Sequence, residues 1–378
     1  MSKPNSTLSP PASNELEISI FGPGYGESIL LHIGNGEWIL VDSCVEPNSG
    51  EPAALHYLTR LGVDVESAVK LIVATHWHDD HVRGLSKIVD KCKSANVALS
   101  GALSVKEFLT LVAVHRNRAT PTTSSLKELA AVLRTLEERG MKGKSAVVDR
   151  QLHYSRIPLS SGVADAKIFS VSPSDGSLLQ ATLAFTQLLQ DSEDQPARVL
   201  TSPTPNHAAV VLWVEVGRHV MLLGADLECT IDPGRGWLAI LNHATVIRAY
   251  ERKAKIFKVA HHGANSAHEP RVWNDIILPE PIAILTPFSR GNISLPTVRD
   301  RGRIKSLTPS AFITAAPREH GYSWSNRVVR DLVKEATRSI RNVHSGWGHV
   351  RVRQIIEDPQ DNWRTELFGD AVPLKEVA

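Results

Sequence analysis

Residues 75–84 read THWHDDHVRG, directly after the apolar run Val69–Ala74. The run is short and contains β-branched residues, which is typical of a strand that is buried on both faces. Alternate residues of an extended segment point to the same side, so His76 and His78 can bind one metal ion together. The sequence therefore predicts a buried strand that carries metal ligands at its end.

Asp80 and His81 follow where the chain turns, and their side chains can reach a second metal ion beside the first. Borderline cations such as Zn²⁺ favour imidazole and carboxylate ligands. Two ions about 3.5–4 Å apart can activate a water molecule and stabilise a leaving oxygen. An isolated pair of histidines would be explained as well by a solvated loop. Four ligand-type residues at HxHxDH spacing favour a dinuclear metal site.

Further strands are predicted on both sides of this motif. Three follow one another early in the chain, and the Gly34-Asn35-Gly36 sequence between the second and third is typical of a hairpin turn. Short apolar runs return in the second half of the chain. The predicted strands are Leu16–Phe21, Ser28–Ile33, Trp38–Asp42, Ala208–Val216, His219–Leu223, Lys255–Ala260, Ile282–Leu285 and Ala311–Thr314, with a last hairpin around His349–Ile355.

The two halves of the chain resemble each other at one point. Hairpin strands lead to Asp42 in the first half, in the sequence WILVD, and to Asp226 in the second half, in the sequence VMLLGAD. Each aspartate comes directly after an apolar run. The pattern predicts two related β-rich halves that face each other across a common site.

These motifs resemble those of the metallo-β-lactamase superfamily. That family carries HxHxDH, a third His before a mid-chain strand, an Asp after a later strand, and a final His. THWHDDHVRG matches the first motif, and LLGAD implies that Asp226 is the carboxylate that bridges the metals. KVAHHG matches the last motif, with His261 favoured as the ligand because it is the first residue after the strand. His262 would then face the substrate as an acid or a phosphate contact.

The resemblance implies an α+β fold, in which two facing β-sheets are flanked by helices in a four-layer αβ/βα sandwich. FGPGYGESILLHIGNGEWILVDSC, residues 21–44, is similar to the start of the ComEC-like branch. That branch contains the hydrolase domains associated with DNA-uptake channels and their free-standing relatives. In this setting Asp42 would hold the HxHxDH loop and would not bind metal itself.

The third motif departs from the family pattern. Asn206 and His207 precede a predicted strand, about twenty residues before Asp226. In the ComEC-like branch an Asn commonly stands at this position, which would align Asn206 with it and leave His207 free. Alternatively, His207 completes a site of three histidines. An amide oxygen is a weaker zinc ligand than imidazole, so a site with Asn206 would bind its first metal less tightly or prefer manganese.

The domain organisation follows from composition and pattern. Residues 1–14 are polar and rich in Pro and Ser, and they predict a disordered tail. Residues 15–378 are expected to form a single hydrolase domain. It would have a helical insertion at about 92–205 and a C-terminal extension of a helix and a hairpin at about 320–378. In the insertion, Ser125 and Glu128 are typical of a capping box at the start of a helix.

Substrate contacts are indicated by three residues. Trp77 lies between two predicted ligands and can stack on a substrate, or pack beneath the loop. A helix predicted near residues 327–341 has a basic face on which Arg330 and Lys334 are candidate phosphate contacts. The same basic residues are also typical of an ordinary solvated helix.

Composition limits the protein class. The formal net charge is +2 and the isoelectric point is near 8.4, which does not by itself require nucleic acid as a partner. The 3 cysteines have no CxxC spacing, which favours reduced thiols. No apolar run approaches the roughly 18 residues that span a membrane, and the N-terminus lacks the apolar core of a secretory signal. We expect a soluble, cytoplasmic protein without a membrane partner.

Three functions are consistent with these residues. The first is a phosphodiesterase or nuclease that uses two divalent ions, zinc or alternatively manganese, to generate a bridging hydroxide. Asp80 and His262 are the residues expected to act in catalysis, and nucleic acid or a small phosphodiester would be the substrate. The second is a hydrolase of a small ester, lactone or thioester, because the same hydroxide serves acyl transfer. The third is a non-catalytic, metal-binding subunit of a multi-component system.

Overall fold

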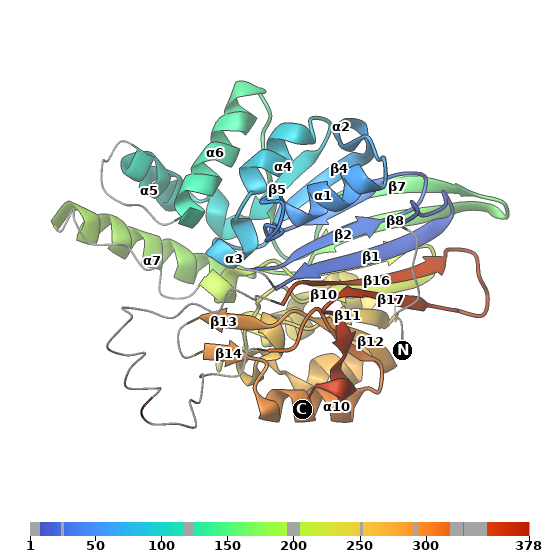
Figure 1. Cartoon of the computed structure of the whole chain (residues 1–378). Coiled ribbons are helices and arrows are strands. Elements are labelled where there is room, and N and C mark those ends of the chain that lie inside the picture. Colours follow the sequence, from blue (N-terminus) through green and yellow to red (C-terminus); the bar gives the residue numbers. More distant parts are fainter. Residues whose placement is uncertain are drawn as a thin grey trace.

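The fold of the protein is a sandwich of two eight-stranded β-sheets with helices on both outer faces (Figure 1). The predicted four-layer α+β architecture is therefore confirmed. The structure is a computed structural model that describes residues 8–23, 26–116, 124–194, 205–249, 252–290, 293–317, 328 and 346–377.

Sheet 1 contains the N-terminal strands and the strand that leads to THWHDDH. Its middle strands are apolar on both faces, because one face packs on helices and the other on sheet 2. In spatial order the strands are β17 (Arg364–Gly369), β16 (Gly348–Ile355), β1 (Glu15–Gly22), β2 (Ser28–His32), β3 (Trp38–Val41), β4 (Val69–Ala74), β5 (Asn96–Ser100) and β6 (Lys144–Ala146).

Sheet 2 contains the strands of the second half of the chain. A separate hairpin of β13 (Phe288–Arg290) and β14 (Ile293–Leu295) follows β12. In spatial order the strands of sheet 2 are β18 (Val372–Pro373), β15 (Ala311–Ile313), β12 (Ile277–Leu285), β11 (Ala254–Lys258), β10 (His219–Leu223), β9 (Leu212–Val216), β8 (Gly162–Ser170) and β7 (Arg150–Leu159).

Helices cover the outer face of each sheet. None of those in the described ranges is both long enough and apolar enough to cross a membrane. On sheet 1 lie α1 (Ala53–Arg60), α2 (Val65–Ala68), α4 (Leu85–Lys91), α5 (Lys106–Arg116), α6 (Ser124–Glu138) and α7 (Asp175–Asp194). The short helix α3 (Asp79–Val82) lies within the HxHxDH loop, residues 76–81 and their neighbours, which is called the metal loop below. On sheet 2 lie α8 (Gly236–His243), α9 (Thr245–Ala249) and α10 (Val298–Leu307). Short 3₁₀ or π turns are η1 (Gly101–Ser104), η2 (Pro205–Ala208), η3 (His261–Gly263), η4 (Asn265–Ala267), η5 (Val272–Ile276) and η6 (Leu374–Glu376).

The strand order of the two sheets is related. In sheet 1, β1, β2 and β3 are antiparallel, and β3 to β6 are parallel. In sheet 2, β8, β9 and β10 are antiparallel, and β10, β11, β12 and β15 are parallel. Asp42 follows β3 and Asp226 follows β10, while THWHDDH follows β4 and HHG follows β11. The four segments that carry the predicted metal-site residues therefore begin at equivalent strand ends of the two sheets.

The region 92–205 differs from the helical insertion that the sequence predicts. Besides α5, α6 and α7 it contains four strands, two of which extend each sheet. In β7 the core residues Leu152 and Ile157 are an odd number of positions apart, because a bulge near Gln151 and His153 shifts the register. This bulge breaks the period of two that would have indicated a strand.

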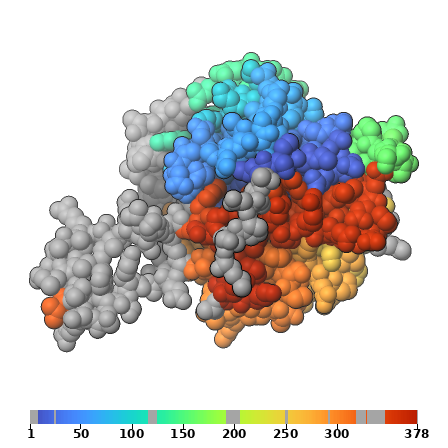
Figure 2. All heavy atoms as spheres, turned by 45° about the vertical axis from the view of Figure 1, so that its right-hand side comes forward, coloured from blue at the N-terminus to red at the C-terminus, as the bar shows by residue number. Residues whose placement is uncertain are grey.

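The C-terminal residues also belong to the sheets themselves. β16 lies beside β1 over its whole length, β17 pairs with β16, and β18 pairs with β15 of sheet 2. Figure 2 shows these residues in red, between the blue N-terminal part and the orange part. The hairpin predicted around His349 is thus present as part of sheet 1, and the chain after it adds β18 to sheet 2.

Candidate metal centre

The HxHxDH loop leaves β4 at Thr75 and is fastened to the end of β3 through Asp42. One carboxylate oxygen of Asp42 accepts a hydrogen bond from the Thr75 N–H at 2.8 Å, and the other accepts one from Thr75 Oγ1 at 2.6 Å. His81 Nδ1 lies 2.7 Å from the same second oxygen. Asp42 therefore fixes the His81 ring and leaves its Nε2 for another partner, in agreement with the loop-holding role that the resemblance implies.

Four buried side chains converge beside this loop, one pair from each half of the chain. His81 Nε2 lies 3.3 Å from Asp226 Oδ2. His262 Nε2 lies 3.4 Å from Asp226 Oδ2 and 3.4 Å from Asp80 Oδ2. Two ligands at 2.0–2.1 Å from a tetrahedral zinc ion are about 3.4 Å apart. The spacing therefore suits one ion held by Asp80, His81, Asp226 and His262.

The ring nitrogens that face this space lack hydrogen bonds. His81 Nε2 and His262 Nε2 are buried and form none within the described part of the chain. Buried polar atoms are normally paired, and a metal ion would satisfy both nitrogens at once. Two imidazoles and two carboxylates are a donor set that suits zinc or manganese. The residues present thus fit a divalent ion.

The charges in this cluster are strongly coupled. Burial alone would lower the pKa of His262, but the Asp226 carboxylate raises it to about 9. Burial likewise opposes a charge on His81, yet neighbouring carboxylates, of which Asp226 is the strongest, raise its pKa well above the usual value. A cation bound at this place would replace the protons on these rings, so metal binding should release protons.

A second group of ligand atoms adjoins the first through Asp226. His76 Nε2 lies 3.2 Å from His78 Nδ1 and 4.0 Å from Asp226 Oδ2. Burial, followed by the neighbouring imidazoles, lowers the pKa of His76 well below its usual value. Neutral imidazole is the form that binds metal. His76, His78 and Asp226 can therefore hold an ion beside the first, with Asp226 shared between the two.

The two adjacent histidines of the HHG sequence point to different surroundings. Both have left-handed backbone angles, with φ of 47° at His261 and 54° at His262, a conformation that is uncommon for residues other than glycine. His262 points into the cluster, where its Nδ1 lies 3.1 Å from Thr286 Oγ1 and its ring stacks on Phe288. The sequence favoured His261 as the ligand, but the structure brings His262 to the other ligand atoms.

His261 instead belongs to a polar group at the margin of the cluster. Its Nδ1 lies 2.8 Å from Glu228 Oε1, and its Nε2 lies 3.2 Å from Asn206 Nδ2. Asn206 Nδ2 also donates to Glu228 at 3.1 Å. His207 Nε2 lies 3.7 Å from the other oxygen of Glu228, so the structure directs His207 to a carboxylate and places it outside the groups of ligand atoms.

Asn206 has an orientation that bears on the third motif. Because its Nδ2 contacts Glu228 and His261, the amide is fixed, and its Oδ1 is buried without a hydrogen bond in the described part of the chain. A buried carbonyl oxygen without a partner is unfavourable. Of the two third-motif candidates, Asn206 is therefore the one with a ligand atom to offer.

A fully buried ion pair lies behind Asp226. Lys258 Nζ is 2.5 Å from Glu27 Oε1 and 3.7 Å from Asp226 Oδ1, and it donates to the Ala225 carbonyl at 2.8 Å. The other oxygen of Glu27 accepts from Thr286 Oγ1 at 2.5 Å. Since Thr286 also contacts His262, the pair connects the supports of two ligands from the second half of the chain.

The β1–β2 loop is held against the metal loop by its backbone. The Glu27 N–H donates to the Asp80 carbonyl at 2.9 Å. A Cβ atom on Gly26 would lie only 1.9 Å from that carbonyl oxygen, and Gly26 has φ of 101°. Only glycine fits both the contact and the backbone angle, which explains why a glycine precedes Glu27 here.

Four polar residues of this site were not predicted from the sequence: Glu27, Lys258, Glu228 and Thr286. Two of them lie in stretches that carried the resemblance, GES and KVAHHG, where a charged residue interrupts a run that is otherwise suited to burial. A charge is almost never buried without a partner, so these interruptions were a usable signal. The pairing of Lys258 with Glu27 joins the two halves of the chain, and spacing in the sequence cannot show such a contact.

The residues predicted to contact substrate are placed as follows. Trp77 is 7% exposed and packs between Phe108 of α5 and Phe185 of α7. It therefore lies beneath the loop, without the open ring face that stacking on a substrate requires. Arg330 and Lys334, with the predicted helix at 327–341, lie outside the described residues.

Helix α6 is anchored on the metal loop in place of the predicted capping box. The Ser125 N–H donates to Asp79 Oδ1 at 2.6 Å, and Glu128 accepts from the Ser86 N–H at 3.1 Å. Asp79, the residue of THWHDDH without a ligand role, thus caps a helix from the neighbouring layer. The tertiary contact replaces the local one that the sequence suggested.

Comparison with protein families agrees with this site. A family model described as Metallo-beta-lactamase superfamily matches residues 21–102, which include Asp42 and the whole HxHxDH loop. This segment is therefore similar to that superfamily, and the two sheets flanked by helices have the metallo-β-lactamase fold. No curated protein matches the chain in sequence.

Several solved structures are similar to the chain at low sequence identity. The metallo-beta-lactamase fold protein YhfI from Bacillus subtilis has 11% identity and a TM-score of 0.38, over 80% of this chain and 96% of that one. A metallo-beta-lactamase from Cronobacter sakazakii, mutated in its HARLDQ motif, has 15% identity and a TM-score of 0.32, over 64% and 75%. Zn(2+)-bound PqqB from Methylobacterium extorquens has 14% identity and a TM-score of 0.29, over 61% and 58%.

Proposed function

We propose that the protein is a metal-dependent hydrolase with a phosphodiester substrate, and that it belongs to the ComEC-like branch of the superfamily matched by residues 21–102. The observation that carries the proposal is the pairing of two adjoining ligand groups with a separate imidazole–carboxylate pair, His261 and Glu228. The ligand groups supply charge stabilisation, while the pair can exchange a proton. Cleavage of a phosphodiester needs both functions.

Two divalent ions, zinc or manganese, would be held in the two groups. One would bind to Asp80, His81, Asp226 and His262. The other would bind to His76, His78 and the shared Asp226, with the Oδ1 of Asn206 as a further ligand. When bound, they would supply Lewis-acid stabilisation and lower the pKa of a water molecule. From the sequence, His262 was expected to act in catalysis. Its buried Nε2, 3.4 Å from two carboxylates, supports a ligand role for it instead.

His261 would move the proton that the leaving oxygen needs. Glu228 holds Nδ1, which fixes the tautomer and orientation of the ring. Nε2, which contacts the Asn206 amide, would exchange that contact for the leaving oxygen when it moves the proton. His261 is also accessible, with 19% of its side chain exposed, whereas the His262 side chain is 2% exposed. Asp80 would contribute as a ligand that helps to orient the attacking water.

The proposal is tested by turnover of defined substrates. The zinc- or manganese-loaded protein is incubated with single- and double-stranded DNA, RNA, a cyclic dinucleotide and bis(p-nitrophenyl) phosphate. We expect phosphodiester cleavage that His78→Ala abolishes and that His243→Ala, at an exposed histidine of α8, leaves unchanged. Cleavage that survives His78→Ala would come from a contaminant and would overturn the proposal.

A lactone, a thioester and p-nitrophenyl acetate are tested in parallel, since ligand residues alone do not select the substrate. If only these acyl substrates turn over, the protein is a hydrolase of another class. If metal binds at two equivalents per chain and no substrate turns over, the protein is a metal-binding subunit. Either result overturns the phosphodiesterase proposal.

The role of His261 is tested separately. We expect His261→Ala to lower kcat by about 10²–10³-fold, which is the usual contribution of a positioned proton donor, without loss of bound metal. The loss should be smaller for a substrate with a p-nitrophenolate leaving group, which needs no proton. An equal loss for both leaving groups, or loss of one metal equivalent, would show that His261 is not the proton donor.

A further inference from the structure

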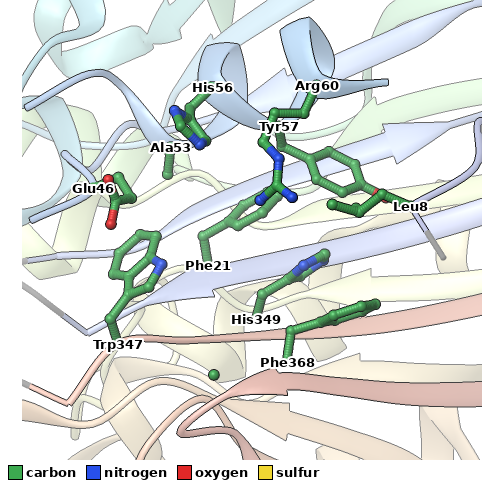
Figure 3. Close-up of a pocket in the computed structure, with 11 residues that line it drawn as sticks. Leu8, Phe21, Glu46, Ala53, His56, Tyr57, Arg60, Trp347, His349 and Phe368 are labelled. Carbon is green, nitrogen blue, oxygen red and sulfur yellow. The ribbon is translucent and has the colours of Figure 1, made fainter. Parts of the chain in front are cut away.

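A pocket separate from the metal centre lies between α1 and the edge of sheet 1, and none of the proposed metal ligands lines it. Its volume is about 260 Å³. Figure 3 shows Phe21, His349 and Phe368 below the pocket, with Tyr57 and Arg60 of α1 above and Trp347 at one side. The pocket belongs to the helix-facing side of the sheet, opposite the core between the two sheets.

The floor of the pocket is a row of three rings on neighbouring strands. Phe21 of β1 is the register partner of His349 of β16, which is the register partner of Phe368 of β17. The ring centroids are 4.4 Å and 4.9 Å apart, with interplanar angles of 26° and 15°. These spacings are close to the distance between strands, so the three rings stack face to face and their edges form the floor of the pocket. Ring edges favour contact with the face of another aromatic ring.

His349 is the polar residue of this floor. It is 6% exposed, and its Nε2 has no hydrogen-bond partner in the described part of the chain. Burial, with Arg351 and Arg353 nearby, lowers the pKa of His349 well below the usual value, so the ring is neutral. A buried ring nitrogen without a partner is unfavourable. A ligand in the pocket that carries a polar atom above the floor would satisfy it.

A cation without an ion-pair partner among the described residues lies at the upper margin of the pocket. Arg60 is exposed, and its guanidinium forms no hydrogen bond or ion pair with any described residue. The other charged lining residue, Glu46, is already bound within its own loop, where it accepts hydrogen bonds from Asn48 and from the Ser49 N–H. These bonds stabilise the carboxylate of Glu46, which keeps its negative charge within that loop. Arg60 is therefore the cation available to a ligand at the upper margin of the pocket.

The wall formed by Tyr57 is rigid. Its hydroxyl donates to Glu17 at 2.9 Å and accepts a hydrogen bond from Arg351 at 3.1 Å. Glu17 is paired with Arg353, and Arg351 is paired with Glu366. The ring is thus held by one buried and one part-buried ion pair, and a preformed wall of this kind reduces the entropy that a ligand loses on binding.

We propose that this pocket binds a small anion with a flat apolar body, such as an aryl or fused-ring carboxylate or phosphate. The ring would lie on the floor formed by Phe21, His349 and Phe368, the anionic group would pair with Arg60, and a polar atom of the ligand would meet His349 Nε2. This site is separate from the metal centre and goes beyond the proposed hydrolase function.

The test is calorimetric titration of the full-length, metal-free protein with 2-naphthoate as the probe. The neutral 2-naphthalenemethanol and inorganic phosphate are titrated in parallel, to separate the contributions of the ring and the charge. We expect one equivalent of 2-naphthoate to bind, at least about tenfold more tightly than the alcohol, and no measurable binding of phosphate. Equal binding of acid and alcohol, or no binding of the acid, would overturn the proposal.

Variants locate the binding site. Arg60→Gln removes an exposed charge and should fold normally, and we expect it to erase the difference between the acid and the alcohol. His349→Phe keeps the row of rings and should weaken binding of both. The control Lys87→Gln, at an exposed cation on α4, should change nothing.

His78→Ala distinguishes this pocket from the metal centre. We expect binding of 2-naphthoate to be unchanged in that variant, because His78 does not line the pocket. If His78→Ala abolishes binding while Arg60→Gln preserves it, the carboxylate binds at the metal centre and the proposed second site is wrong.

Discussion

Asp42 and Asp226 occupy equivalent places in the two halves of the fold, yet their surroundings differ. Each follows the last antiparallel strand of its sheet, next to the parallel strand that leads to the histidines. Asp42 is fully bonded to Thr75 and His81 at 2.6–2.8 Å. Among the described residues no side chain lies as close to the Asp226 carboxylate, since His81 and His262 lie 3.3–3.4 Å from it and Lys258 lies 3.7 Å away.

The same position in the two halves of the fold thus has two different roles, support of the loop by Asp42 and metal binding by Asp226. Satisfied hydrogen bonds make Asp42 a fixed support for the loop. Asp226 is held only from behind, by the positive charge of Lys258, and its Oδ2 faces ring nitrogens that have no hydrogen-bond partner. A carboxylate that is positioned but not fully bonded is what a metal site requires. The comparison leads to four predictions, given from the largest expected effect to the smallest.

Replacing the shared carboxylate should have the largest effect. Asp226→Asn removes a charge from both ligand groups, so we expect loss of at least one metal equivalent and a fall in activity of about 10³-fold or more. Metal content by elemental analysis and kcat/KM are measured together. Asp165→Asn, at a half-exposed aspartate of β8, is the matched control. Full metal content in Asp226→Asn would contradict its role as the bridging ligand.

Breaking the buried pair behind Asp226 should cost stability. In Lys258→Met the Glu27 carboxylate remains buried without its cation, and we expect a loss of about 3–5 kcal/mol in the free energy of unfolding. Urea unfolding of the metal-free protein measures it. The exposed pair of Lys87 and Glu51 is the control, because Lys87→Met should cost at most about 1 kcal/mol.

A second variant shows whether the loss comes from the unpaired charge. Lys258→Met combined with Glu27→Gln removes both charges, and it should recover much of the stability that Lys258→Met loses. If the double variant is as unstable as the sum of the two single variants, the pair contributes no coupling and the support for Asp226 comes from packing.

Asp42→Asn should have a smaller effect that appears in metal affinity. The amide can still accept from Thr75, but it cannot provide the charge that orients His81, so we expect metal to bind about 10–100-fold more weakly. Competition with a chromophoric chelator measures the affinity. In contrast with Asp226→Asn, saturating metal should restore most of the activity. Activity that stays absent at saturation would show that Asp42 is itself needed for the reaction.

Acid should weaken the first of the two hairpins that precede these aspartates. His32, on β2, accepts a hydrogen bond from the Gly36 N–H at 3.1 Å, and burial lowers its pKa from 6.5 to about 4. The unfolded chain therefore binds a proton near pH 6.5 that the folded chain does not bind until about pH 4. Stability is full above pH 6.5 and is lost as pH falls below it.

Between pH 7.5 and pH 5.5 the contribution of His32 corresponds to a loss of about 1 kcal/mol. It is measured as the difference in pH dependence of unfolding between the metal-free wild type and His32→Gln. The variant will be less stable overall, so only the slope is compared. Equal slopes in the two proteins would show that His32 does not titrate in this range.

Several parts of the site could be predicted from the sequence because they are local. His76, His78, Asp80 and His81 lie within six positions after an apolar run, and the geometry of an extended turn brings such residues together in any fold. The strands before Asp42 and Asp226 were also predictable, since hairpin turns and apolar runs are short-range signals. The strand β7 was not predicted, because its bulge breaks the short-range alternation that indicates a strand.

The choice between His261 and His262 could not be made in this way. Adjacent residues in a strand would point to opposite sides, but both have left-handed backbone angles, so the alternation does not apply. The His261 ring contacts Glu228 and Asn206. The His262 ring contacts Thr286 and Phe288. These partners come from three separate segments that only the packed fold brings together.

The sequence by itself therefore determined the ligand chemistry, a dense set of imidazole and carboxylate side chains. It also determined the buried strand before them and the two related halves of the chain. The tertiary structure alone decided which residue does what, including the buried Lys258–Glu27 pair behind Asp226 and the ring pocket below α1. The physical reason is that ligand type is a property of single residues, whereas burial, pairing and orientation depend on neighbours that are far apart in the chain.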